Sequence, residues 1–407
     1  SEMCIRDRAG AGSAPAPLSG FLLHPAARSR HGRRIFRGFT GGSLSRRSGD
    51  RQPRLHHESA SLHQRSSETA APCYQSEMAA QLGLFGDPPP ARHEVALAEV
   101  SPALRELAGR IHASVRLGTS SWSFPGWRGL VWEGEHSEQV LARRGLAAYA
   151  RHPLFRAVAI DRTHYAPIDA AAFRAYAEVV PPGFRFLTKA HEVCTLAQFP
   201  THARYGAQRG QMNPSFFDVA YARDAVVAPF VEGLGASAGP LLFQLAQQPL
   251  EVLGGSPRRF AEKLYRFLRD LPKGPLYAVE VRNAQLLTAD YRAALQAAGA
   301  VHCISAIPQL PPPAEQPVLP GPLVVRWLLA RHHSYQTALE AYQPFDRLHE
   351  PDPSTRRQVA RLVHAAQQRG EPVWVIANNK AEGSAPLTLA ELAAALVAEQ
   401  DADELPF

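Results

Sequence analysis

Charged and polar side chains stand within or directly after several short apolar runs of this chain, at positions that could form one site. Glu280 lies in the apolar run 278–281, and Arg326 lies in the run 324–327. A charge in such a run is expected to be paired when it is buried. Glu280 could therefore pair with Arg326, Arg282 or Lys189. Such a cluster could be a network that holds the fold, or a clamp for a carboxylate or phosphate with an acid–base group.

Glu280 and Lys189 are the candidate catalytic residues. Glu280 would transfer a proton, while Lys189 and Arg326 would neutralise an oxyanion or a phosphate. Lys189 could alternatively be a Schiff-base nucleophile if burial or a nearby cation lowers its pKa. The candidate substrate-binding residues share positions at, or just past, the ends of apolar runs: Arg326, Arg282, Gln244, Asn378, Asn379, Trp122, Tyr165 and Ser384.

Several of these residues also have plainer interpretations. Ser384 precedes a helical pattern, where free amides could bind an anion or where the serine could simply cap a turn. Trp122 and Tyr165 could stack on a sugar or base, or pack the rim of the fold. His191 could be a general base, and Asp161, His191 and Glu280 could hold a divalent metal. Their spacing does not require a metal, so we identify no metal site and no cofactor.

The elements that must position these residues are eight apolar runs, most of them followed by a helical pattern. A barrel of parallel strands has this alternation and carries its chemistry at the carboxyl ends of its strands. The pattern predicts a TIM-type (β/α)8 barrel, with an open doubly wound sheet as the alternative. The predicted strands are 115–118, 157–160, 184–188, 241–245, 277–281, 301–304, 323–327 and 373–377.

The chain divides into four parts by composition. Residues 1–77 are rich in Ser, Arg, Gly and His and lack a sustained helical or strand period. We expect them to be disordered and to be non-native upstream sequence, with Met78 as the native start. Residues 78–112 form a tail and an amphipathic helix that could cap the bottom of a barrel. The barrel occupies 113–400, and 401–407 form a tail.

Charge and apolar content exclude some classes of protein. Residues 1–77 hold 12 of the 44 basic and 6 of the 37 acidic residues, so the remainder holds 32 basic and 31 acidic residues and is nearly neutral. Electrostatic binding of nucleic acid by the folded part is therefore weakly supported. No apolar run approaches the roughly 20 residues of a membrane span. The four cysteines are scattered, as expected of a cytoplasmic protein.

Six motifs in order give the chain a resemblance to the domain-of-unknown-function family 72. They are the segments 118–127 (Gly-Thr-Ser-Ser-Trp-Ser-Phe-Pro-Gly-Trp), 163–165, 186–190, 242–245, 280–283 and 378–385. The resemblance covers about 115–399, and it implies a TIM barrel without assigning a reaction. The chain departs from the family pattern at Asp161, at His164, and at 327–329, which stand where Asn, an aromatic residue and Leu-His-Gly are usual.

Three functions are consistent with these residues. The first is a hydrolase, lyase or isomerase that acts on a small anionic or sugar-like substrate at the barrel mouth. The second is a metal-dependent nucleic-acid-processing barrel that resembles abasic-site endonucleases. The third is a non-catalytic barrel that binds a ligand. Motifs for nucleotide binding, serine hydrolysis and zinc proteolysis (GxGxxG, the P-loop, GxSxG and HExxH) are missing from the sequence.

Overall fold

The computed structural model describes residues 94–404 of the chain. The interpretation of residues 1–77 as a disordered, non-native extension lies outside the described residues, as do residues 78–93 of the expected tail and residues 405–407. None of the described helices combines the length and apolar character that crossing a lipid bilayer would require.

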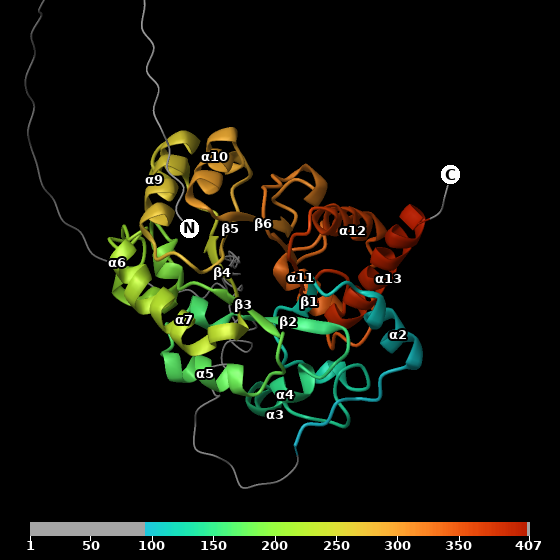
Figure 1. Ribbon diagram of the computed structural model, residues 1–407. Helices are drawn as coiled ribbons and strands as arrows, with labels where there is room; N and C mark the ends of the chain where they lie inside the picture. The colour runs from blue at the N-terminus through green and yellow to red at the C-terminus, as the bar shows by residue number, and fades with distance from the viewer. Residues whose placement is uncertain (1–93, 405–407) are drawn as a thin grey trace, which may run out of the picture. The chain divides into compact units, whose positions relative to one another are not determined.

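Eight parallel strands close into a barrel in the order of the sequence (Figure 1). This arrangement confirms the (β/α)8 fold and excludes the open sheet. The strands are β1 Val115–Thr119, β2 Phe155–Ile160, β3 Arg185–Lys189, β4 Ala238–Leu245, β5 Tyr277–Val281, β6 Val301–Ala306, β7 Leu323–Trp327 and β8 Val373–Ala377. The closing pair, β1 and β8, runs in register from Val115 opposite Val373 to Thr119 opposite Ala377.

The strands are apolar because both of their faces are covered. One buried cluster includes Ala157, Leu187, Leu242, Ala278 and Ile376, which alternate with residues of a second, larger cluster that includes the helices. All five residues of β5, β7 and β8 are buried. Helices cover the outer face of these strands, and packed side chains fill the interior. A charged group on these strands therefore has no contact with bulk water. This is why the apolar runs are nearly continuous.

Helices surround the strands (Figure 1). Side chains of Ser137, Asp169, Ser256 and Thr288 accept hydrogen bonds from backbone amides in the first turns of the helices that follow them. The main helices are α2 Pro102–Arg110, α3 Glu138–Arg144, α4 Leu146–Tyr149, α5 Ala170–Glu178, α6 Val219–Ala222, α7 Ala228–Leu234, α8 Leu250–Leu253, α9 Pro257–Asp270, α10 Ala289–Ala298, α12 Pro353–Gln368 and α13 Ala385–Glu404.

A further helix, α11 (Tyr335–Tyr342), lies between β7 and α12. The signals for this helix are local. Ser334 accepts a hydrogen bond from the Thr337 amide, and the Thr337 side chain binds the Ser334 amide, which completes a capping box. Leu339 and Tyr342 then bury one face of the helix.

The amino-terminal ends of the strands meet α2. The Arg156 guanidinium, near the start of β2, donates hydrogen bonds to the carbonyl oxygens of Ala108, Ile111 and His112. These carbonyls belong to the last turn of α2 and the residues after it, where intrahelical partners are lacking. Arg156 thus connects the helix to the end of the barrel opposite the carboxyl ends of the strands.

Candidate functional site

A pocket of about 410 Å³ opens at the carboxyl ends of the strands. It contains six of the residues to which the sequence assigned chemistry, and these come from β3, β4 and β7 and from the segments just after β2, β5 and β8. Other parts of its wall are apolar or uncharged. The residues that line it are Asp161, Lys189, Gln244, Ala246, Gln247, Arg282, Ile307, Gln309, Arg326, Leu328, Leu329, Ser334, Tyr335 and Asn378.

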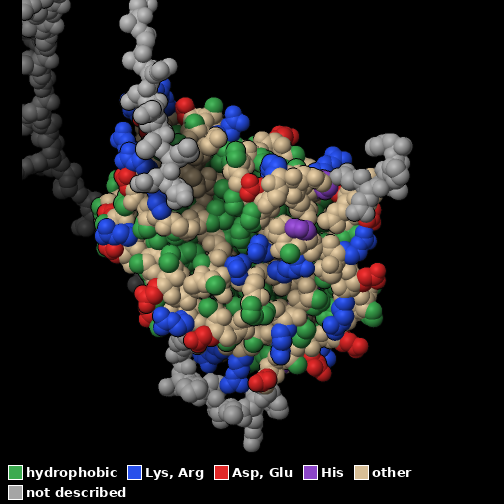
Figure 2. Space-filling model, in the orientation of Figure 1, with side chains coloured by type: hydrophobic (Ala, Val, Ile, Leu, Met, Phe, Trp, Pro, Cys, Tyr) green, Lys and Arg blue, Asp and Glu red, His purple; other side chains and the backbone are tan. Residues whose placement is uncertain are grey.

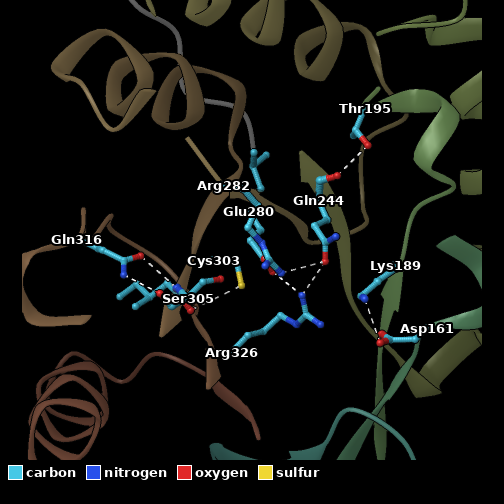
Figure 3. Close-up of polar contacts among 12 residues, drawn as sticks. Asp161, Lys189, Thr195, Gln244, Glu280, Arg282, Cys303, Ser305, Gln316 and Arg326 are labelled. Atoms are coloured by element: carbon cyan, nitrogen blue, oxygen red, sulfur yellow. Dashed lines mark hydrogen bonds and ion pairs between the residues drawn. The ribbon is translucent and has the colours of Figure 1, made fainter. Parts of the chain in front are cut away.

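Glu280 lies beneath this pocket and joins its two arginines (Figure 3). Oε1 accepts a hydrogen bond from Nε of Arg282, and Oε2 accepts one from Nη1 of Arg326, each at 2.5 Å. Nη1 of Arg326 also donates to Oε1 of Gln244 at 3.0 Å. Strand register places Gln244 opposite Glu280 on the adjacent strand β4, while Arg326 reaches Glu280 from β7, two strands away across β6.

The two arginines determine the ionisation of Glu280. Complete burial would raise the pKa of this carboxyl group, but the positive charges of Arg282 and Arg326 outweigh burial and lower the pKa to about 2. Glu280 in turn helps to raise the pKa of Arg326 above its ordinary value, against the effect of burial. Glu280 is therefore a fixed anion near neutral pH, which makes it a poor proton donor and a weak base.

Lys189 forms the second charged pair of the site. Its Nζ lies 2.9 Å from Oδ2 of Asp161, and the Lys189 side chain is 3% exposed against 26% for Asp161. Burial lowers the pKa of Lys189, Asp161 opposes that effect, and the charge of Arg326 lowers it further. Lys189 is thus a buried amine whose pKa is set by opposing effects of its charged neighbours.

Asn378 lines the other side of the pocket, and its orientation is fixed. Its Nδ2 donates to Oγ of Ser120 at 2.7 Å, while its Oδ1 accepts from the backbone amide of Lys380 at 3.0 Å. These contacts connect the segment after β8 to the segment after β1.

The loops after β7 and β8 are joined to each other. The Ala330 amide donates to the Lys380 carbonyl oxygen at 2.9 Å, and the His349 amide donates to the Glu382 carbonyl oxygen at 2.7 Å. The buried Glu382 carboxylate accepts hydrogen bonds from the Asp352 amide and from Nη2 of Arg356, the latter at 2.8 Å. Burial nevertheless raises the pKa of Glu382 above its ordinary value.

Four predicted substrate-binding residues do not line this pocket: Tyr165, which is described below, and Trp122, Asn379 and Ser384. Trp122 is fully buried, and its indole nitrogen donates to the carbonyl oxygen of Ala142. Oδ1 of Asn379 is occupied by the Trp127 indole and the Ala385 amide, so this side chain joins segments of the fold. Ser384 is also fully buried. The side chains of Trp122, Asn379 and Ser384 are all buried, and none of them lines the pocket.

Tyr165 and His191 belong to a neighbouring polar cluster on the loops after β2 and β3. The Arg204 guanidinium lies 5.1 Å from the centre of the Tyr165 ring, and Nδ1 of His191 lies 2.6 Å from the hydroxyl of Tyr221. Arg204 also binds the buried Glu192 at 2.6 Å. Neither Tyr165 nor His191 lines the pocket.

The proposed metal ligands Asp161, His191 and Glu280 are each engaged elsewhere, with Lys189, Tyr221 and two arginines respectively. Among residues 94–404, the group of three ligand atoms close enough to hold an ion lies instead on His332, His333 and Glu350. Sequence reasoning missed this group. The adjacent histidines after strand β7 were the available signal, but their partner is 17 residues further along the chain.

Sequence reasoning also missed pocket residues that lie several positions beyond the strand ends. Gln247 and Gln309 follow β4 and β6, and Tyr335 begins α11. Apart from polarity, the sequence carries no pattern that marks them.

Comparison with known proteins identifies one family for this chain. The model of the family described as "Protein of unknown function DUF72" matches residues 116–406. Solved structures that resemble the chain include a DUF72 family protein from Enterococcus faecalis V583 and another from Thermotoga maritima MSB8. The first is 15% identical, covers 72% of this chain and 99% of its own, and has a TM-score of 0.42. The second is 20% identical, covers 71% and 99%, and has a TM-score of 0.45. No curated protein matches the chain.

Proposed function

Because the chain belongs to the DUF72 family of proteins of unknown function, we propose a function from the pocket alone: an enzyme that binds a small anionic substrate at the barrel mouth. The reaction class is proton transfer within that substrate, as in a lyase or isomerase. The proposal rests on one observation. Two arginines, Arg282 and Arg326, and the buried Lys189 line the same pocket of about 410 Å³.

An anion is supported by the balance of charge around the pocket. Lys189, Arg282 and Arg326 face two carboxylates, those of Asp161 and Glu280. Each carboxylate is already paired, so one positive charge remains when Lys189 is protonated. Arg282 has a side chain that is 26% exposed, which leaves part of its guanidinium free to meet a carboxylate or phosphate group.

The proposed acid–base group is Lys189, and the proposed role of Glu280 is to position the arginines, whereas the sequence led us to expect Glu280 to transfer the proton. Lys189 has a lowered pKa and lines the pocket. Glu280 is fully buried, has both oxygens engaged, and holds the two arginines in place. Asp161 would keep the Lys189 amine oriented, and Asn378 would present its amide to the substrate.

Binding is the first test, and it uses the full chain. We would screen inorganic phosphate, small carboxylates, sugar phosphates and short oligonucleotides by thermal shift, then titrate the hits by calorimetry. Arg282→Met should weaken binding of a small anion. Arg258→Met is the matched control, since Arg258 is an exposed arginine on α9 with one carboxylate partner. Equal affinity in wild type and Arg282→Met would overturn the proposal.

Catalysis is tested separately with each ligand that binds. Incubation in D2O followed by NMR would detect exchange of carbon-bound protons, and mass spectrometry would detect new products. Lys189→Met should still bind the anion but should lose exchange and turnover. Binding without exchange or product in the wild type would favour the non-catalytic barrel. If oligonucleotides bind in preference to small anions, and if their affinity falls as the salt concentration rises, the hypothesis of a nucleic-acid-processing barrel would be favoured.

A further inference from the structure

We propose that His332, His333 and Glu350 form a binding site for a divalent transition-metal ion at the rim of the barrel mouth. Their ligand atoms all lie within 4.8 Å of one another. The site is separate from the charged cluster around Glu280, and the proposal does not depend on the anionic substrate.

Two consecutive histidines turn the same ring nitrogen toward the same carboxylate. Nε2 of His332 contacts Oε2 of Glu350, and Nε2 of His333 lies 3.0 Å from Oε1. The two imidazole rings are side by side, with centres 4.8 Å apart. Three donors that converge from a histidine pair and one carboxylate form an incomplete coordination shell, in which water or a substrate group would supply the remaining ligands.

The surroundings of the three side chains hold them in this arrangement. Nδ1 of His333 lies 3.0 Å from Oγ1 of Thr337, which leaves Nε2 to face Glu350. Metal-binding histidines are commonly oriented in this way by a hydrogen bond to their second nitrogen. The Glu350 amide donates to the carbonyl oxygen of Glu382 at 3.2 Å, so the carboxylate comes from an anchored segment.

The chemistry of the donors selects the ion. Two imidazoles and one carboxylate suit Zn²⁺, Fe²⁺, Co²⁺ or Ni²⁺, whereas Mg²⁺ and Ca²⁺ prefer oxygen ligands alone. The exposure of the side chains, 69% for His332, 16% for His333 and 38% for Glu350, leaves an entry path from solvent. Ser334 and Tyr335, the next two residues in the chain, line the pocket, so a bound ion would lie beside it.

The test is metal binding by the full chain, without any assay of activity. Calorimetric titration with Zn²⁺ should show one more bound equivalent in the wild type than in His333→Ala or Glu350→Gln. Co²⁺ should give visible absorption bands of a nitrogen- and oxygen-ligated ion in the wild type alone. Mg²⁺ should not compete. His112→Ala is the control, because His112 is an exposed histidine at the opposite end of the barrel.

His332→Ala keeps the test decisive if the other variants unfold, since the exposed His332 side chain contributes little packing. Circular dichroism would show that each variant retains its helices. Loss of one Zn²⁺ equivalent in folded His332→Ala and Glu350→Gln, with the control unchanged, supports the site. Equal stoichiometry and affinity in the wild type and these folded variants would overturn it.

Discussion

Both ends of the barrel carry clustered cationic side chains, but the groups that contact these cations differ between the two ends. At the amino-terminal end, Arg116 and Arg185 line a pocket of about 810 Å³, twice the volume of the pocket at the mouth. Within residues 94–404, no carboxylate pairs with Arg116, Arg156 or Arg185. The Arg116 guanidinium instead lies 5.1 Å from the centre of the Trp374 ring, and Arg156 binds backbone carbonyls.

At the mouth, cationic side chains are paired with carboxylates. Glu280 contacts Arg282 and Arg326, and Asp161 contacts Lys189. The result is a set of opposed charges in a smaller space, where charged neighbours shift the pKa values of Glu280, Arg326 and Lys189. The comparison shows that the larger cavity is not the one in which opposite charges meet. Shifted pKa values that arise from charged neighbours are the reason that we propose the smaller pocket as the site of proton transfer.

Removal of the central carboxylate should have the largest effect. Glu280→Gln leaves Arg282 and Arg326 without their counter-ion in a buried position, so the free energy of unfolding should fall by about 3–5 kcal/mol. Urea denaturation measures this change. Glu262→Gln, which breaks an exposed pair on α9 with Arg258, should cost less than about 1 kcal/mol. Similar losses in both variants would contradict the importance of burial at the mouth.

The same variant should change how stability depends on pH. The pKa of Glu280 is about 2 in the folded protein against an ordinary value of 4.5. Glu280 therefore contributes stability above pH 4.5, and this contribution is lost as the pH falls toward 2, on the order of 3 kcal/mol in total. Glu280→Gln should lack this component of acid destabilisation.

A histidine at the opposite end should act in a different pH window. His152 is buried near the start of β2, and burial together with Arg105 lowers its pKa from 6.5 to about 4. The unfolded chain therefore takes up a proton that the folded chain excludes, and stability falls as the pH decreases from 6.5 to 4. His152→Asn keeps an acceptor for the Leu154 amide. The free energy of unfolding of His152→Asn should depend on pH less steeply than that of the wild type, by up to about 1.4 kcal/mol per pH unit. An equal pH dependence of both proteins in urea denaturation would refute this.

Lys189 should titrate below the ordinary lysine value of 10.5. The chain holds four lysines, Lys189, Lys263, Lys273 and Lys380, so ¹³C-lysine NMR gives a spectrum that Lys189→Met can assign. Asp161→Asn should lower the pKa of Lys189 further, because Asp161 raises it. A bound anion should raise it. A Lys189 signal that titrates at or above the ordinary value would contradict the proposed acid–base role.

The smallest effect should follow removal of a cation at the amino-terminal end. Burial lowers the pKa of Arg116, and the positive charges of Arg185 and Arg156 lower it further. Arg116→Met loses a contact with Trp374 but relieves this repulsion, so stability should change by less than about 1 kcal/mol. Anion binding at the mouth should be unaffected. A loss as large as that of Glu280→Gln would remove the distinction between the two ends.

The barrel could be predicted from sequence because each strand is a separate apolar run. The starts and ends of β5, β7 and β8 agree with the predicted runs. Lys189, Gln244, Arg282, Arg326 and Asn378 could be placed at the mouth because strand ends define that edge. The roles of these residues could not be predicted in the same way, since the pKa of Glu280 depends on the directions of two side chains, Arg282 two residues away and Arg326 on a strand 46 residues further along the chain.

Side-chain direction accounts for the remaining differences. Asn378 and Asn379 are adjacent, yet one lines the pocket and the other binds Trp127. A sequence records that both follow β8 but not which one points inward.

Charged side chains of both signs are scattered over the face visible in Figure 2, around an apolar area, which agrees with the near-neutral charge calculated for residues 78–407.

The hydrogen bonds between the loops after β7 and β8 have a consequence for the kinetics of ligand binding. The contacts of Ala330 with Lys380 and of His349 with Glu382 hold the two loops to each other through backbone hydrogen bonds. A ligand that binds here would not have to order these loops, so little of its interaction energy would be lost as conformational entropy. Its association rate should then follow diffusion and charge, and should fall as ionic strength screens the arginines.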